Sequence, residues 1–168
     1  MKELVNCGWA GTIQEFLCIS LEDTLSKLIE MLQDDESKAA QIIAWQDCLR
    51  HLHHILKHYQ YSEDFIIFEY IIPRSGLSRP DVIILQQREK LQVKVLEFKS
   101  FPHITDAEKW QLRLYLKKLK LYHELCYQET AQVDGILITT AFEKAELPMY
   151  LVILKRSAPF PTVRKIPR

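Results

Sequence analysis

Residues 80–99, PDVIILQQREKLQVKVLEFK, contain two strand-like apolar runs joined by a short polar segment. The runs are PDVIIL (80–85) and LQVKVLEF (91–98), and the QQREK between them has the composition of a turn. The second run contains a carboxylate, Glu97, and is followed directly by an amine, Lys99. An unpaired charge in an apolar strand costs several kcal/mol, so this Glu–Lys pair requires a specific role.

A third strand-like run, FIIFEYII (65–72), precedes these two. It is separated from residues 80–85 by PRSGLSR, which is rich in turn-forming residues, so we expect a hairpin. Side chains at positions i and i+2 of a strand project from the same face, which makes Glu97 and Lys99 neighbours. A hairpin through the QQREK turn would bring Asp81 beside them.

Two carboxylates that converge on one point form an anionic, oxygen-rich site suited to Mg²⁺ or Mn²⁺. The cation would offset their mutual repulsion and polarise a phosphodiester. A lysine beside them can orient or help deprotonate the attacking water, and it can stabilise charge on the phosphorus oxygens. The pattern of Asp81, Glu97 and Lys99 therefore favours a metal-dependent phosphodiesterase site.

Helical spacing of apolar residues marks the first part of the chain. Residues 12–33 predict a helix, with Ser20 or Asp23 as the cap of its second part. The acidic DDES (34–37) is expected to separate it from a long helix over residues 37–59. The apolar stripe of this long helix consists of Ile42, Trp45, Leu49, Leu52 and Leu56.

A helix and two strands are predicted after the strand triplet. The helix covers residues 105–128, with Thr105 or Asp106 as its cap, and the strands cover 135–142 and 149–155. The tail, APFPTVRKIPR, holds three of the seven prolines and is expected to be irregular. Because helices precede and follow the strands, the order of elements predicts an α/β fold with a mixed sheet flanked by helices.

At its charged residues the chain resembles the PD-(D/E)XK nuclease superfamily. The motif stands as Pro80-Asp81 and Glu97-Phe98-Lys99, on an element order that matches the αβββαβ core of the restriction-endonuclease-like fold. The sequence QLRLY (111–115) is similar to the QxxxY motif of the RecB-like branch of that superfamily.

The resemblance covers residues 37–142 and implies one nuclease-like domain over residues 1–168. Residues 1–36 would form an N-terminal helical extension, and residues 143–168 a C-terminal strand and irregular tail.

The resemblance implies a role for each motif residue. Asp81 and Glu97 would bind Mg²⁺ or Mn²⁺, with the backbone carbonyl of Phe98 as a third donor. Lys99 would be the catalytic lysine. On the following helix, Gln111 and Tyr115 would support the site or touch the scissile strand, since their spacing places both on one helix face.

Two positions, Glu69 and Gln41, leave alternatives open for the ligand set. Glu69, on the first predicted strand, is either an additional metal ligand or a solvated residue at the sheet edge. Members of the superfamily often carry another acid on the first helix, whereas the motif-like position here is Gln41. A catalytically inactive module of the same fold, which binds nucleic acid or scaffolds an assembly, is therefore the alternative to a nuclease.

The net charge is zero, but its distribution is uneven. Residues 1–84 hold 7 Lys/Arg and 13 Asp/Glu, and residues 85–168 hold 15 and 9. Three basic residues lie beside the QxxxY motif and are candidates for phosphate contacts, namely Arg113, Lys117 and Lys118.

We expect DNA as the partner, with RNA as an open alternative. Residues 68–85, followed by VLEFKS (95–100), also resemble nuclease-like regions that precede helicase-type ATPase domains. This resemblance suggests such an ATPase or another defence or repair protein as a partner. The sequence contains no GxxxxGK[ST] phosphate-binding loop, so any motor would be another chain. Homo-oligomerisation is left open.

Composition excludes several other classes of protein. Apolar residues make up 48% of the chain and charged residues 26%, as in soluble globular domains. No apolar stretch reaches the roughly 18 residues that span a bilayer, and the start lacks the apolar region of a signal peptide. Scattered cysteines without a CxxC indicate reduced thiols rather than a disulfide or zinc framework. These features predict a cytoplasmic protein without a membrane partner.

Overall fold

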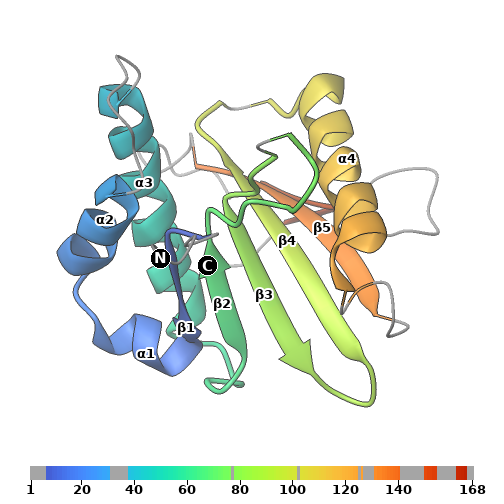
Figure 1. Ribbon diagram of the computed structural model, residues 1–168. Coiled ribbons are helices and arrows are strands. Elements are labelled where there is room, and N and C mark those ends of the chain that lie inside the picture. Colours follow the sequence, from blue (N-terminus) through green and yellow to red (C-terminus); the bar gives the residue numbers. More distant parts are fainter. Residues whose placement is uncertain are drawn as a thin grey trace.

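In the computed structural model of this chain, the fold is built on a single mixed sheet (Figure 1). The structure describes residues 7–30, 38–76, 78–101, 103–124, 126, 131–140, 150–154 and 162–165. Within these residues, seven strands lie side by side in their order along the chain. They are β1 (Trp9–Thr12), β2 (Phe65–Phe68), β3 (Val82–Gln87), β4 (Leu91–Lys99), β5 (Gln132–Thr139), β6 (Tyr150–Leu154) and β7 (Thr162–Lys165).

Strand direction follows from the connections between the strands. β4 and β5 are parallel, and the other neighbouring pairs are antiparallel. Parallel neighbours require a crossover, and helix α4 (Asp106–Tyr122) lies in the connection between these two strands. The prediction of an α/β fold with a mixed sheet flanked by helices is therefore confirmed.

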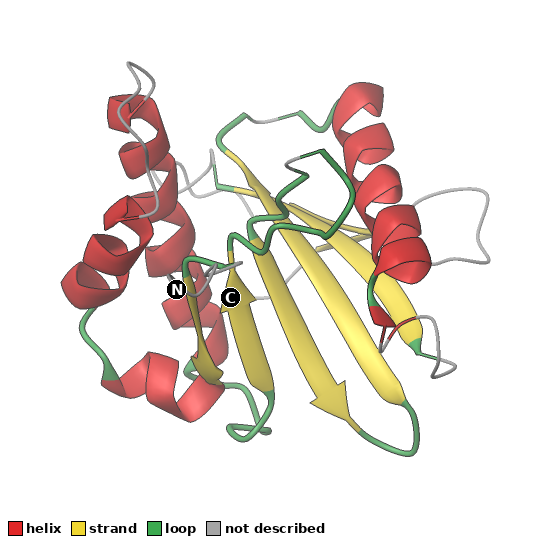
Figure 2. Ribbon diagram, in the orientation of Figure 1, coloured by secondary structure: helices red, strands yellow, loops and turns green. Residues whose placement is uncertain are grey.

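Helices cover both faces of the sheet (Figure 2). Helices α1 (Ile13–Cys18), α2 (Leu21–Glu30) and α3 (Lys38–Leu56) lie on one face, and α4 lies on the other. Each face has its own apolar core because side chains alternate along the strands. On β4, Leu96 belongs to the core under α3, whereas Val93 and Val95 belong to the core under α4.

Side chains cap the helices where the sequence predicted a start. Thr105 forms a capping box with Glu108 at the beginning of α4. The Ser20 hydroxyl accepts a hydrogen bond of 3.0 Å from the amide of Asp23 at the start of α2, which selects Ser20 over Asp23 as the cap. The acidic DDES (34–37) lies outside the described residues.

Helix α4 approaches the sheet closely at Gly135. A Cβ at this position would lie 2.8 Å from the Leu112 side chain, well inside van der Waals contact. Gly135 pairs with Val95 on β4, so the contact places α4 over the junction of the two parallel strands. This close packing sets the distance between α4 and the end of β4.

Several predictions for single elements were wrong. The strand β1 was not expected, and β7 lies in the tail that was expected to be irregular. The strand predicted over residues 65–72 ends at Phe68, because Glu69 takes a left-handed conformation with φ of 54°. Helix α4 ends at Tyr122 rather than at residue 128. In the described part of the chain, no helix is long and apolar enough to cross a membrane.

Candidate active site

The motif residues meet at the end of the sheet where β3 begins and β4 ends (Figure 1). Val82 pairs with Leu96, so the preceding Asp81 lies opposite Glu97. Ile83 and Val95 point into the core under α4, and side-chain alternation therefore directs Asp81 and Glu97 toward the same face. We call Asp81, Glu97 and Lys99 the carboxylate site.

Asp81 and Glu97 are fixed by a reciprocal exchange of hydrogen bonds. The Asp81 amide donates to Glu97 Oε1 at 3.1 Å, and the Phe98 amide donates to Asp81 Oδ2 at 2.7 Å. Glu97 is buried, whereas Asp81 keeps part of its surface accessible. The exchange holds both carboxylates in place before any ligand arrives.

The Phe98 carbonyl lies on the Asp81 side of β4. The amide and carbonyl of one strand residue point to the same neighbouring strand, and the Phe98 amide points to Asp81. The next residue confirms the alternation, because the Lys99 carbonyl accepts from Thr140 beyond β5 at 2.9 Å. The predicted third oxygen donor therefore faces the carboxylates.

Lys99 joins the carboxylates to helix α4. Its Nζ lies 3.3 Å from Glu97 Oε2 and 3.5 Å from Gln111 Oε1. Gln111 Nε2 in turn donates to the Tyr115 hydroxyl at 2.7 Å. The structure thus brings all five residues of the two motifs into one connected chain of polar contacts.

Burial and mutual repulsion make this site electrostatically strained. Burial raises the pKa of Glu97 to about 8, and the negative charge of Asp81 contributes to the shift. Burial also raises the pKa of Asp81, although the Phe98 amide and the Lys99 charge oppose the increase. A cation at this point would favour the ionised form of both carboxylates.

Glu69 is a buried acid, and the alternative of a solvated edge residue is wrong. Its left-handed backbone turns the side chain to the α3 face, where Glu69 Oε1 accepts from the Trp45 indole at 2.6 Å. Glu69 Oε2 lies 2.6 Å from Arg79 Nε. Burial and the charge of Asp81 raise the pKa of Glu69 to about 7, so the two acids sense each other.

Sequence reasoning missed three residues around these acids. Trp45 was interpreted as a core residue, and Arg79 was passed over although it stands next to Pro80-Asp81. Burial raises the pKa of the Cys48 thiol, and the charges of Asp81 and Glu69 raise it further. Helix α3 therefore contacts Glu69 from the other face of the sheet. Only the position of Arg79 beside the motif could have been noticed in the sequence.

The carboxylate site offers oxygen donors that fit Mg²⁺ or Mn²⁺. Mg²⁺ is usually held by one or two carboxylates, waters and substrate phosphates, which matches Asp81, Glu97 and the Phe98 carbonyl. Glu69 has both oxygens engaged by Trp45 and Arg79. Among the described residues, no group of three or more His, Cys, Asp and Glu side chains is arranged to hold a metal. Waters and substrate oxygens would have to supply the other ligands of a cation held there.

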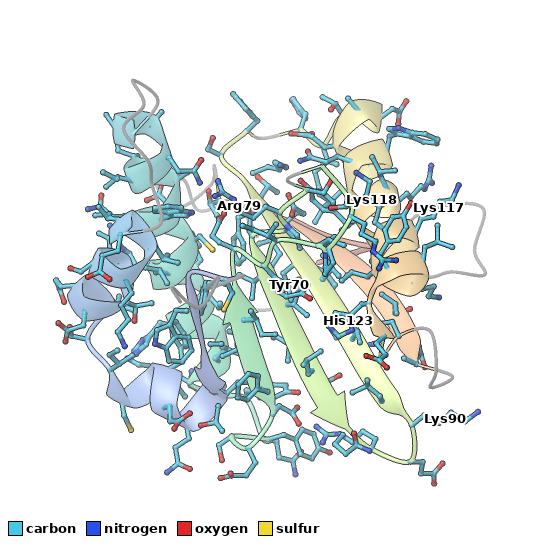
Figure 3. The ribbon with its side chains drawn as sticks, in the orientation of Figure 1. Tyr70, Arg79, Lys90, Lys117, Lys118 and His123 are labelled. Carbon is cyan, nitrogen blue, oxygen red and sulfur yellow. The ribbon has the colours of Figure 1, made fainter. Side chains whose placement is uncertain are left out.

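The three candidates for phosphate contacts on α4 have different surroundings, and two of them, Lys117 and Lys118, are labelled in Figure 3. Arg113 and Lys117 are exposed and lie about 200° around the helix from Gln111 and Tyr115, respectively, at the usual 3.6 residues per turn. Lys118 instead donates to the Ser75 carbonyl at 2.9 Å and to the Ser78 hydroxyl. These hydrogen bonds connect the loop between β2 and β3 to α4.

Comparisons with protein-family models, with curated proteins and with solved structures give no match to this chain. The resemblance to the superfamily therefore rests on the motifs and on the geometry of the carboxylate site.

Proposed function

We propose that this protein is a Mg²⁺- or Mn²⁺-dependent nuclease that hydrolyses phosphodiester bonds in DNA. The observation that carries the proposal is the convergence of Asp81, Glu97 and Lys99, with two hydrogen-bonded carboxylates beside one amine. Two repelling acids held in a buried setting cost stability, and a cation-dependent reaction gives a reason for that cost.

The residues divide the chemistry between them. Asp81, Glu97 and the Phe98 carbonyl would hold the cation, which would supply Lewis-acid chemistry at the phosphodiester. Lys99 orients the attacking water and stabilises the charge that develops on the phosphorus oxygens. A new P–O bond forms to the water oxygen while the bond to the leaving oxygen breaks, without a covalent enzyme intermediate. Gln111 positions Lys99, and Tyr115 positions Gln111.

The order of elements supports a PD-(D/E)XK core of the restriction-endonuclease-like type. Helix α3, strands β2, β3 and β4, helix α4 and strand β5 follow one another as the αβββαβ pattern requires. The QxxxY pair lies on α4 within reach of Lys99, as the RecB-like branch implies. A helicase-type ATPase or another defence or repair protein remains the partner suggested by the resemblance.

A cleavage assay tests the proposal. Circular and linear DNA, each single- and double-stranded, is incubated with the protein with and without Mn²⁺. We expect Mn²⁺-dependent cleavage of at least one form, and loss of that cleavage in Asp81→Asn. Cleavage that is equal in the wild type and the variant would place the activity elsewhere or in a contaminant. An RNA substrate in parallel settles the choice of nucleic acid.

One observation favours a second function, a non-catalytic nucleic-acid-binding or scaffolding module. Helix α3 presents Gln41 where superfamily members often have an acid, and Asp81 and Glu97 each already accept a backbone hydrogen bond. A pair of carboxylates whose hydrogen bonds are already made within the protein can have a purely structural role. DNA binding without cleavage of any form in Mn²⁺ would select this function.

A further inference from the structure

Arg79 lies beside the carboxylate site and is held in an unusual way. It stands two residues before Asp81, and Figure 3 shows it at the end of the sheet where β3 begins. Its Nε lies 2.6 Å from Glu69 Oε2, and its side chain is 31% exposed while that of Glu69 is 3% exposed. The ion pair thus has a buried acid at its base and a guanidinium that reaches the surface.

The acid that holds Arg79 is itself fixed. Glu69 receives the Trp45 indole hydrogen bond on its other oxygen, and its left-handed backbone is set by pairing of its amide with the Asp81 carbonyl at 3.0 Å. Glu69 therefore has little freedom to follow Arg79. The guanidinium is oriented in advance, which lowers the entropy that a ligand must offset on binding.

The outer edge of the guanidinium remains available. Arginine presents five N–H donors in a planar fork, and the ion pair with Glu69 is made at Nε. Among the described residues, none forms a hydrogen bond with the two Nη nitrogens of Arg79. A guanidinium with a free donor edge matches the oxygens of a phosphate.

The position of this edge relates it to the proposed chemistry. Glu69, which holds Arg79, also donates its amide to the Asp81 carbonyl at 3.0 Å, so the ion pair lies directly beside the residue that begins the carboxylate site. A nucleic-acid strand whose scissile phosphate meets Asp81 carries further phosphates on either side. One of them would come within the range of Arg79.

We propose that Arg79 binds a phosphate of the nucleic-acid strand next to the scissile one, with Glu69 and Trp45 as the residues that position it. The nature of the ligand rests on the proposed function. The role of Glu69 is then to hold Arg79 rather than to bind the cation. This differs from the metal-ligand role that the sequence suggested for Glu69.

A second ion pair provides a matched control at the other end of β3. Arg88 Nη2 lies 2.6 Å from Asp64 Oδ2, with exposures of 31% and 4%. There, however, the guanidinium lies over the Tyr61 ring at 4.1 Å, and its Nη1 donates to the Gln87 carbonyl at 3.0 Å. The two pairs are alike in burial and length, but the guanidinium of Arg88 is already occupied.

The experiment compares two paired variants. In Glu69→Gln/Arg79→Gln and in Asp64→Asn/Arg88→Gln, both charges of a pair are removed, so neither variant leaves a buried charge without a partner. Binding of short fluorescein-labelled single-stranded and duplex oligodeoxynucleotides is measured by anisotropy in Ca²⁺ over a series of salt concentrations. Thermal melting checks that each variant is folded.

Loss of one phosphate contact reduces the slope of log K against log salt by about 0.7 to 0.9. We expect this reduction in Glu69→Gln/Arg79→Gln and an unchanged slope in Asp64→Asn/Arg88→Gln. The role of Arg79 would be overturned if the slopes were equal in all three proteins or were reduced equally in both variants. It would also be overturned if the wild type bound neither probe. If the expected slopes are found but Mn²⁺ yields no cleavage, the nuclease proposal fails and the phosphate contact stands.

Discussion

Acidic side chains are buried at both ends of strand β3, but the hydrogen-bond donors around these acids differ greatly between the two ends. At the end where β3 finishes, Asp64 is the single acid of a cluster formed with Tyr59, Gln86 and Arg88. The three donors lie within 2.6 to 3.1 Å of Asp64 Oδ2. We call these four residues the Asp64 cluster.

At the end where β3 begins, three acids crowd together. Glu69, Asp81 and Glu97 all have raised pKa values, with burial as the largest cause in each case. Asp81 and Glu97 each accept from one backbone amide, and Lys99 adds a contact to Glu97. Glu69 is contacted by Trp45 and Arg79. The Asp64 cluster is rich in donors, whereas the end where β3 begins is rich in acceptors. The proposed function gives these acceptors a cation to bind.

The largest effect is expected for Lys99→Ala. Because Lys99 acts on the attacking water and on charge that develops in the transition state, its loss should lower the cleavage rate by about 100-fold or more. Binding of the DNA in Ca²⁺ should change far less. Single-turnover cleavage and anisotropy on the same preparation measure the two quantities.

Thermal melting of Lys99→Ala separates catalysis from stability. If Lys99 serves only as the ion-pair partner of Glu97, its loss leaves a buried carboxylate unpaired and lowers the melting temperature. A well-folded Lys99→Ala protein that cleaves at the wild-type rate would refute the assignment.

Amide substitutions should affect stability oppositely at the two ends of β3. Asp64→Asn weakens hydrogen bonds to a buried charge and should cost about 2–3 kcal/mol of unfolding free energy. Glu97→Gln removes a repelling, desolvated charge and should cost nothing or stabilise the metal-free protein at pH 8. Denaturant unfolding in the presence of a chelator measures both. An equal loss of unfolding free energy in the two variants would contradict the proposed difference between the two ends of β3.

Stability of the metal-free protein should decrease with rising pH. The pKa of Glu97 is raised in the folded state from 4.5 to about 8, so the folded protein holds a proton that the unfolded chain releases. The stabilisation is therefore complete below about 4.5 and is lost as the pH rises through about 8. Melting temperatures over this range, with Glu97→Gln as the control, should show a slope that the substitution reduces and that Mn²⁺ flattens.

The smallest effect concerns the outer face of α4. Arg113 and Lys117 are exposed and point away from Gln111 and Tyr115, so they can contribute only through long-range attraction. Replacing both by Gln should weaken DNA binding slightly at low salt and leave the cleavage rate of bound DNA unchanged. Loss of cleavage in this variant would mean that the nucleic acid passes over the outer face of α4.

The strand triplet and helix α4 were predictable because their signals are local. Alternation and turn composition identified β2, β3 and β4, and the cap at Thr105 identified the start of α4. Strand β1 was missed because it has only four residues, WAGT, of which Ala and Gly disfavour strands, so that it depends on pairing with β2. Local pattern carries no information on such a long-range contact.

The carboxylate site was likewise predictable from spacing, because i,i+2 alternation and the hairpin set its geometry. Glu69 was not, since a single left-handed residue reverses the direction of its side chain. The partners of Glu69 come from α3 and from the loop before β3, and an apolar stripe does not reveal that the Trp45 indole donates to a buried acid. Tertiary packing decides these contacts.

Binding of Mn²⁺ measured by titration calorimetry tests the central claim most directly. The comparison uses the wild type, Asp81→Asn and the Asp64→Asn/Arg88→Gln pair at the same pH, each first shown to be folded. We predict that the wild type and the Asp64 cluster variant bind Mn²⁺ with equal affinity, and that Asp81→Asn loses the binding. Equal binding by Asp81→Asn and the wild type would contradict the claim that the acceptor-rich end of β3 is the metal site.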